Sequence, residues 1–397
     1  MTSFFRPGLA LTSIGALALL AACGGGTGTP AAAPAPLAAQ SATDASRIAP
    51  TIPEHAGRRL FEDETFGGNG RTCLTCHSRD TGTVSPGDAL TRLAANPADP
   101  LFIADGSDDG AGHGNTRMLA DATVLVRIPL PDNVSLANDP KARSVVVRRG
   151  IPSTLNTPAL DPVLMLDGRQ PDLPAQARGA VADHAQGTRE PTPKELELIA
   201  AFQRTPAFFS SPPLQAFALG GARPELPAGK TEAEQRGRRF FIDAPPVPPP
   251  AGDFKTGLCA GCHSGPMLNE TNEFIPAPPF RRGGRFQSVA VSEFNAAKNP
   301  VIDFLFRNPD GSVTAVASPD PGRALITGNA QDFDSHNAFK IPSLWGVART
   351  APYFHDNSAK TLEDVARHYA RFFAAISPIV LTQQDQDDMV AYMKLLK

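Results

Sequence analysis

Apolar residues recur at helical spacing in several parts of this 397-residue chain. In TLEDVARHYARFF they lie three or four positions apart, behind Thr361 and an acidic residue three positions later, which predicts an amphipathic helix that begins with a capping box. TPKELELIAAF from Thr192 and TQQDQDDMVAY from Thr382 begin in the same way. GRRLFED from Gly57 and KTEAEQRGRRFFID from Lys230 also have helical patterns. The chain is therefore expected to be mainly α-helical.

Two stretches alternate in the manner of strands. TVLVRIPLP from Thr123 and ARSVVVRRG from Ala142 are rich in β-branched residues, and they predict one small pair of strands in the first half. The chain also contains 40 prolines and 34 glycines, which favour turns and irregular connections. We expect short helices, long loops and little β structure.

The chain repeats parts of its own pattern. GRRLFED at 57–63 and GRRFFID at 237–243 are identical at five of seven positions. IPSTLN from Ile151 returns as IPSLWG from Ile341. Further pairs of positions correspond downstream: Pro162 with Pro352, Leu166 with His355, Asp167 with Asp356, and Leu173 with Leu362. The repeat predicts an internal duplication with one helical domain at 50–222 and another at 223–397.

The first segment has the pattern of a bacterial export signal. Arg6 precedes a short apolar run that ends in Leu-Ala-Ala-Cys, so residues 1–23 resemble a lipoprotein signal in which Cys23 becomes the lipid anchor. An ordinary cleaved signal is the alternative. Residues 24–49 are rich in Gly, Ala, Pro and Thr, which predicts an unfolded tether. We expect a protein on the periplasmic side of a membrane, either lipid-anchored or soluble.

The remaining four cysteines all belong to two Cys-x-x-Cys-His units. The residues concerned are Cys73, Cys76 and His77, and Cys259, Cys262 and His263. Two thiols at this spacing can add to the vinyl groups of one haem while the adjacent histidine binds its iron. A disulfide pair or a zinc site is the alternative. The net charge of −3 does not suggest a nucleic-acid partner. The sequence predicts two covalent c-type haems.

Several motifs together resemble a known family. GRRLFEDETFGGNGRTCLTCH from Gly57, the Asp167–Ala177 stretch DGRQPDLPAQA, CAGCHSG from Cys259 and FKIPSLWGVARTAPYFHDNSAKTLEDV from Phe339 are similar to the bacterial di-haem cytochrome c peroxidases and MauG-type proteins. The resemblance implies two cytochrome c-like helical domains. It also implies that hydrogen peroxide reacts at the first haem with electrons that a small cytochrome delivers through the second. A homodimer is a candidate assembly of this chain.

Some positions depart from that family. Members commonly carry a glutamate about ten residues after the Gln-Ala pair, and Gln186 occupies that position here. Because an amide cannot relay a proton, His184 and Glu190 are the neighbouring candidates for acid/base work. Leu166 stands where relatives often have a tryptophan that bridges the haems. The only tryptophan, Trp345, is either a replacement electron-transfer residue or part of the core.

The sixth ligand of the second haem is also unusual. Relatives place Met or Tyr just before the Phe-Lys-x-Pro stretch, whereas this chain offers His336. A loop at 105–113, DGSDDGAGH, begins like a calcium loop but lacks the closing glutamate, so it is either a calcium site or a solvated acidic turn. His113 in this loop is a further candidate for a removable ligand of the first haem.

Three functions follow from these features. The leading hypothesis is an exported di-haem peroxidase that reduces hydrogen peroxide. The second is a MauG-like oxidase that modifies a partner protein, which the missing Met ligand and the missing glutamate favour. The third is a di-haem electron carrier without catalysis, which the replacement by Gln186 favours.

Overall fold

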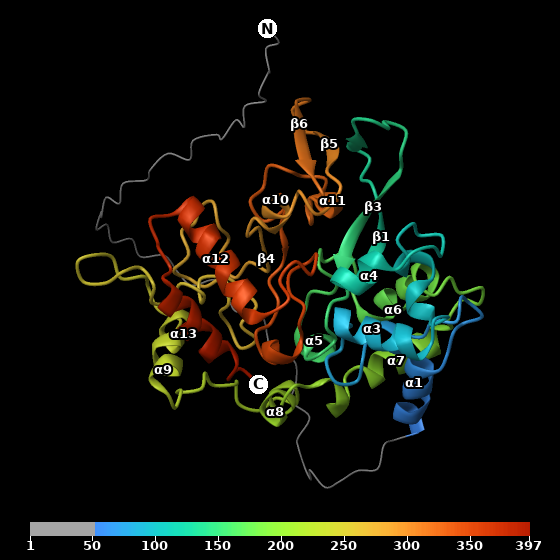
Figure 1. Ribbon diagram of the computed structural model, residues 1–397, viewed down its shortest axis with the longest axis horizontal. Helices are drawn as coiled ribbons and strands as arrows, with labels where there is room; N and C mark the ends of the chain where they lie inside the picture. Colours follow the sequence, from blue (N-terminus) through green and yellow to red (C-terminus); the bar gives the residue numbers. More distant parts are fainter. Residues whose placement is uncertain (1–51) are drawn as a thin grey trace, which may run out of the picture. The chain divides into compact units, whose positions relative to one another are not determined.

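The computed structural model describes residues 52–397. The signal segment 1–23 with Cys23 and the tether 24–49 lie outside the described residues. None of the helices within 52–397 is both long enough and apolar enough to cross a membrane. The described part is helix-rich with modest sheet content (Figure 1).

Short α-helices carry most of the regular structure. Those before residue 223 are α1 (Ile52–Glu62), α2 (Cys73–Cys76), α3 (Pro86–Ala95), α4 (Thr116–Asp121), α5 (Thr157–Leu160), α6 (Leu173–Asp183), α7 (Pro193–Phe202) and α8 (Pro212–Ala218). Those after it are α9 (Glu232–Arg238), α10 (Val291–Phe294), α11 (Ala324–Thr327), α12 (Leu362–Ile376) and α13 (Gln383–Met393). Short 3₁₀ helices cover Pro100–Phe102, Ala104–Gly106, Pro206–Phe208, Arg239–Phe241 and Val347–Arg349.

The predicted capping boxes are confirmed. Thr192, Thr361 and Thr382 precede α7, α12 and α13, and each threonine hydroxyl accepts the backbone N–H of the acid three positions later. That acid in turn accepts the threonine N–H, as Asp385 does from Thr382 at 2.9 Å. Thr231 caps α9 with the same reciprocal pair. Each of these helices therefore begins where a threonine and an acidic side chain accept hydrogen bonds from backbone N–H groups that have no partner within the helix.

Two helix pairs with the same arrangement lie next to the two Cys-x-x-Cys-His units. The first helix of each half packs against the last: α1 against α7, and α9 against α13 (Figure 1). Both contacts occur at a glycine of the repeated GRR stretch. A Cβ at Gly57 would lie 2.2 Å from the carbonyl oxygen of Leu198, and one at Gly237 would lie 2.0 Å from that of Asp388. Only glycine allows the two helices to approach so closely at these points.

The strands form three small antiparallel sheets. β1 (Thr123–Pro129) pairs with β3 (Ser144–Gly150), as the sequence predicted. β4 (Phe286–Gln287) pairs with β7 (Phe339–Lys340). A third sheet joins β2 (Val134–Leu136), β5 (Ile302–Arg307) and β6 (Val313–Ser318), in which β5 is central. The β5–β6 hairpin was missing from the sequence prediction, although its buried Phe304 and Phe306 alternate with more exposed residues.

The sheet β2–β5–β6 connects parts of the chain that are far apart in sequence. The largest hydrophobic cluster combines apolar residues at 84–151 with others at 304–330. A second cluster lies within 214–396 and includes Trp345 and Tyr392, and a third surrounds Phe61 and Phe66. Because β5 and β6 complete a core that begins before residue 223, the division at 222/223 stays a prediction.

Candidate functional site

The first Cys-x-x-Cys-His unit is a single turn of helix with its histidine at the end. α2 holds both cysteines, and His77 follows as the C-terminal cap, whose backbone N–H donates to the carbonyl of Cys73. The ring Nδ1 of His77 lies 2.8 Å from the carbonyl oxygen of Gly82. Gly82 has φ +67°, and a Cβ there would lie 2.6 Å from the backbone nitrogen of Thr154. The carbonyl that orients the histidine therefore depends on a glycine.

The second unit repeats this geometry in a turn. The backbone N–H of His263 donates to the carbonyl of Cys259 at 2.8 Å. Its ring Nδ1 lies 2.8 Å from the carbonyl oxygen of Leu268, five residues further along, as Gly82 is from His77. Leu268 also has a positive φ, of 52°. Two unconnected segments thus hold their histidines by the same contact.

This contact defines which ring nitrogen remains available. A carbonyl accepts only from a protonated Nδ1, so Nε2 of each ring carries the lone pair that can bind a metal. Burial lowers the pKa of both His77 and His263, which keeps the imidazoles neutral, as iron ligation requires. The two histidines are therefore prepared as ligands by the polypeptide itself.

The cysteines beside them are free and surrounded by protein. All four thiols are unpaired. Burial raises the pKa of Cys73 and of Cys262 to about 12, and that of Cys259 further, so the thiols are protonated at neutral pH. Unpaired thiols three positions apart, next to a histidine with an available Nε2, match the three points of attachment of a c-type haem. Both units fit that group.

Two of the predicted catalytic residues lie together near the first unit. The side-chain amide of Asn69 donates to the carbonyl of His184 at 3.0 Å and to Oε1 of Gln186 at 3.2 Å. Burial lowers the pKa of His77, the carbonyl of Gly82 opposes this, and His184 lowers the pKa slightly further, so the two imidazoles interact electrostatically. Gln186 has φ +52° and an exposed side chain.

The sequence reasoning missed two residues that hold His184. Nδ1 of His184 is hydrogen-bonded to Oδ2 of Asp105, and the guanidinium of Arg71 binds the other oxygen of Asp105. Although burial opposes it, the hydrogen bond from His184 and the charge of Arg71 lower the pKa of Asp105. Arg71 is 2% exposed and also donates to the carbonyl oxygens of Pro100 and Leu101. Nε2 is the ring nitrogen of His184 that Asp105 does not bind.

The third predicted catalytic residue lies apart from this group. The Glu190 side chain is 74% exposed and forms an ion pair with Nε of Arg178 at 3.1 Å. Its carboxylate has no described contact with His184 or Gln186. The structure therefore brings together two of the three candidates and leaves Glu190 at the surface.

The loop considered for calcium has other partners. Asp105 binds Arg71 and His184, and Asp109 accepts the backbone N–H of Ala111 at 2.8 Å. Nδ1 of His113 donates to the carboxylate of Asp109 at 2.7 Å, and the His113 side chain is 83% exposed. Within residues 52–397, no group of three or more His, Cys, Asp or Glu side chains is arranged to hold a metal ion. Calcium binding and ligation by His113 stay predictions.

Trp345 lies beside the second unit. Its indole N–H donates to the carbonyl oxygen of Pro266 at 2.9 Å, three residues after His263. Its own carbonyl accepts from the side-chain amide of the buried Asn156 at 3.1 Å. The residue belongs to the second hydrophobic cluster and is 7% exposed. Trp345 therefore packs in the core and at the same time joins the second unit to the first half.

His336 occupies a loop before β7. Its Nδ1 lies 3.0 Å from the carbonyl oxygen of Ala330, an orientation that again leaves Nε2 available. The ring is partly buried. Its role as the sixth ligand of the second haem stays a prediction.

The two halves meet through a reciprocal pair of backbone hydrogen bonds. Gly150 N–H donates to the carbonyl of His355 at 2.7 Å, and Lys340 N–H donates to the carbonyl of Leu166 at 2.7 Å. Gly150 corresponds to Lys340 in the repeat, and Leu166 to His355. In each half, the N–H at one position of the repeat therefore donates to the carbonyl at the equivalent acceptor position of the other half. This exchange is the arrangement that a pseudo-two-fold axis produces.

Charged and aromatic side chains surround this junction. The buried Arg149 binds Asp167 and forms two hydrogen bonds with Asp320, with Nε–Oδ2 at 2.6 Å and Nη2–Oδ1 at 3.0 Å. Its guanidinium carbon lies 5.6 Å from the centre of the Phe339 ring. That ring stacks on His355 with centroids 3.6 Å apart and planes 7° from parallel. None of these contacts was predicted from the sequence.

The curated relatives with similar sequences are peroxidases. The chain is 30% identical to the cytochrome c551 peroxidase of Nitrosomonas europaea over 118 residues, which is 30% of this chain and 25% of that protein. It is 31% identical to the cytochrome c peroxidase Ccp of Escherichia coli over 144 residues, or 36% of this chain and 23% of that protein. The chain thus matches about a quarter of the length of either relative. No family model matches the chain.

Solved structures of low sequence identity resemble it over most of its length. A MauG-like protein associated with microbial copper homeostasis is 19% identical, with a TM-score of 0.47 over 89% of this chain and 91% of that one. The dihaem peroxidase BthA of Burkholderia thailandensis is 16% identical, with a TM-score of 0.46 over 90% and 89%. Both scores are too low to add detail to the site. The sequence similarities confirm the predicted resemblance to the bacterial cytochrome c peroxidases over about a third of this chain.

Proposed function

We propose that this chain is the polypeptide of an exported di-haem c-type peroxidase, with one haem on Cys73, Cys76 and His77 and another on Cys259, Cys262 and His263. The observation that carries the proposal is the repeated contact of each histidine Nδ1 with a carbonyl five residues later, at 2.8 Å in both units. A c-type haem with an open sixth position supplies a binding site for peroxide and electrons to cleave its O–O bond.

The polypeptide would contribute proton transfer at the first haem through His184. Because Nδ1 of His184 is bound to Asp105, its Nε2 can take a proton from the near oxygen of peroxide and return it to the leaving oxygen. Asp105 would act as the positioning residue and Arg71 would hold the carboxylate in place. Gln186 would orient peroxide by hydrogen bonding, since its amide cannot exchange the proton.

The two haems would divide the work between the two halves. Peroxide would react near His184 in residues 50–222, and electrons from a small cytochrome or another one-electron donor would enter through 223–397. The glycine contacts at Gly57 and Gly237 and the exchanged hydrogen bonds at the junction support a duplication of one haem-binding unit. Attachment of the protein to the periplasmic side of a membrane through Cys23 completes the proposal.

Protein matured in a bacterial periplasm tests this proposal in two steps. Mass spectrometry and a pyridine haemochrome assay should find two covalent haems per chain. Rapid mixing of the half-reduced protein with hydrogen peroxide should then change the spectrum of one haem within the first turnover. A chain without covalent haem, or two haems that peroxide leaves unchanged, would contradict the proposal.

A non-catalytic electron carrier is the second candidate. The exposed Gln186 in place of an acid favours it, as does the surface position of Glu190. In a pure carrier both irons are six-coordinate. Room-temperature electronic spectroscopy separates the two candidates, because a high-spin five-coordinate signal in the half-reduced protein excludes the carrier.

A further inference from the structure

We infer that the stacked rings of Phe339 and His355 form the electron bridge between the two haem sites. The inference rests on the proposed function, because it requires a haem on each unit. It assigns a role to Phe339 and to His355, the repeat counterpart of Leu166. Its basis is the position of the pair at the junction and the chain of covalent and hydrogen bonds that leads from each ring towards one of the two Cys-x-x-Cys-His units.

The pair lies where the two halves exchange equivalent contacts. His355 and Leu166 are corresponding residues, and each accepts a backbone hydrogen bond of 2.7 Å from the other half. Phe339 and Arg149 correspond as well, and their side chains contact each other across the junction. Residues that touch their own repeat counterparts lie on the pseudo-two-fold axis. Any group on this axis is placed equivalently with respect to the two haem-binding units.

The second haem loop is close to Phe339 along the chain. β7 carries Phe339 and continues directly into Pro342, whose backbone is within hydrogen-bonding range of the His263 imidazole. Pro342, two residues beyond the end of β7, therefore connects this strand with the His263 ring through its backbone. This half of the route contains no gap through solvent, because Ile341 is buried.

The first haem loop reaches His355 through the matching segment. Gly82 accepts the hydrogen bond of His77, and the neighbouring Thr83 donates its hydroxyl to the carbonyl of Ile151 at 2.6 Å. Gly150, next to Ile151, donates to the carbonyl of His355. Every other step of this route is a covalent bond or a hydrogen bond. The remaining step is the contact between the Phe339 and His355 rings, whose centroids are 3.6 Å apart and whose planes are nearly parallel.

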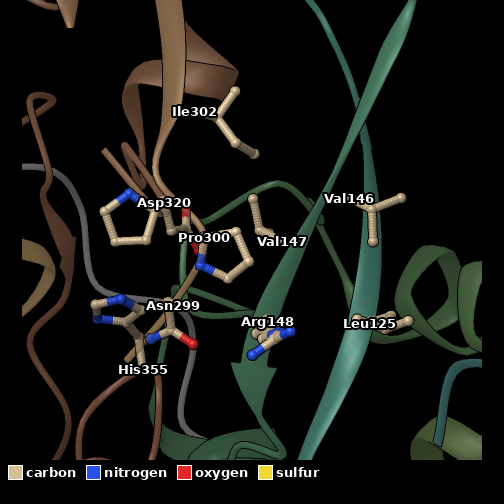
Figure 2. Close-up of a pocket in the computed structure, with 10 residues that line it drawn as sticks. Leu125, Val146, Val147, Arg148, Asn299, Pro300, Ile302, Asp320 and His355 are labelled. Atoms are coloured by element: carbon tan, nitrogen blue, oxygen red, sulfur yellow. The ribbon is translucent and has the colours of Figure 1, made fainter. Parts of the chain in front are cut away.

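The side chains around His355 keep the contact in place. Its ring is 5% exposed, and Nε2 lies 3.4 Å from the hydroxyl of Ser292. His355 and Asp320 line a small cavity between two parts of the chain (Figure 2). Figure 2 shows Val147 and Arg148 of β3 on one side of it, and Asn299 and His355 on the other.

The electron balance of the proposed step is simple. The group on His263 loses one electron and the group on His77 gains one, and no bond forms, no bond breaks and no proton moves. Phe339 and His355 shorten the gap through which the electron tunnels, and neither ring is oxidised. Trp345, which also contacts both halves, is the competing route.

The full-length matured protein with both haems tests the bridge by direct measurement of electron transfer. A photoexcited reductant delivers less than one electron per chain, and absorbance follows its redistribution between the haems. His355→Leu and Phe339→Leu should each slow this redistribution, because loss of either ring lengthens the gap through which the electron tunnels. Phe339→Tyr, which keeps the stack, and Trp345→Phe should leave the rate unchanged.

The possible outcomes distinguish the two proposals. Normal redistribution in both leucine variants, with two haems bound and both potentials unchanged, overturns the bridge. If electron redistribution is slow in Trp345→Phe and normal in both leucine variants, the route runs through Trp345, and this result also overturns the bridge. If His355→Leu does not fold, Phe339→Leu and Phe339→Tyr still compare the same contact. Fewer than two covalent haems in the unaltered protein would instead contradict the proposed function.

Discussion

Gly57 lies directly against the carbonyl of Leu198, so that a Cβ on Gly57 would be 2.2 Å from that oxygen. Gly237 meets Asp388 in the same way at 2.0 Å. A methyl group at either position must push the first and last helices of that half apart. Because α1 and α9 lead into the two Cys-x-x-Cys-His loops, the separation would also displace the cysteines that follow them.

Gly57→Ala is expected to destabilise the protein by about 1–3 kcal/mol, the usual cost of overpacking. Chemical denaturation followed by circular dichroism measures the change. Gly87→Ala is the matched control, because its Cβ would meet only the hydroxyl of Ser85 at 3.7 Å and alanine favours a helix. Equal stabilities of the two variants would show that the helix contact tolerates a methyl group.

Arg149→Met should have a larger effect. The guanidinium is buried between Asp167 and Asp320, and its removal leaves two carboxylates without their main partner. Breaking a buried pair on one side typically costs about 3–5 kcal/mol. Arg58→Ala, which removes a surface pair with Glu62, should cost at most about 1 kcal/mol. A destabilisation of Arg149→Met as small as that of Arg58→Ala would mean that water or rearranged side chains replace the guanidinium.

The same cluster predicts a pH dependence. Although burial opposes it, the charges of Arg149 and Arg169 lower the pKa of Asp167. A carboxylate whose pKa is lower in the folded state stabilises the fold above its unfolded pKa of about 3.9, and this contribution is lost as the pH falls through the folded value. The stability difference between the unaltered protein and Arg149→Met should therefore shrink below about pH 4. Denaturation curves of both proteins at pH 7 and in acid measure this difference in the free energy of unfolding. If the difference is the same at both pH values, the assignment to Asp167 is wrong.

Local features of the sequence were sufficient for much of the fold. The capping boxes of α7, α12 and α13 depend on residues three positions apart, and the two Cys-x-x-Cys-His units on five consecutive residues. The β5–β6 hairpin could also have been found, because Phe304 and Phe306 alternate with less buried residues ahead of the turn Asn-Pro-Asp-Gly at 308–311. It was missed because its core partner, β2, lies more than 160 residues earlier.

Contacts between distant residues could not be predicted in this way. Asp105 is 34 positions from Arg71 and 79 from His184, and its position in an acidic loop suggested calcium instead. The stack of Phe339 on His355 lies within residues 223–397, and it likewise depends on how two separate segments of that half pack together. Charged and aromatic side chains carry no periodic signal of their partners, so these parts of the site appear only in three dimensions.

His336→Ala tests the sixth ligand of the second haem. With Nδ1 held by Ala330, Nε2 of His336 is available to an iron. Loss of this ligand should convert one haem from a low-spin to a high-spin spectrum. His113→Ala, a change at an exposed histidine, should leave the second haem unaltered. An unchanged spectrum in His336→Ala would remove His336 from the ligand set.

Asp105→Asn tests the proton transfer proposed for His184. The amide cannot hold the Nδ1 proton of His184 as the carboxylate does, so the orientation of Nε2 is lost while the volume of the side chain is kept. General acid–base catalysis contributes about 10²–10⁴-fold, so the reaction with peroxide should slow by up to that factor, with both haems still bound. His184→Gln should have an effect of the same size, and the double variant should be no slower than either single one, because both residues serve one proton. Glu190→Gln is the control, since its carboxylate contacts Arg178 at the surface, and its rate should be normal. If Glu190→Gln is the slow variant and Asp105→Asn is not, the acid/base group is Glu190, and the loop that carries it must move towards the haem when peroxide binds.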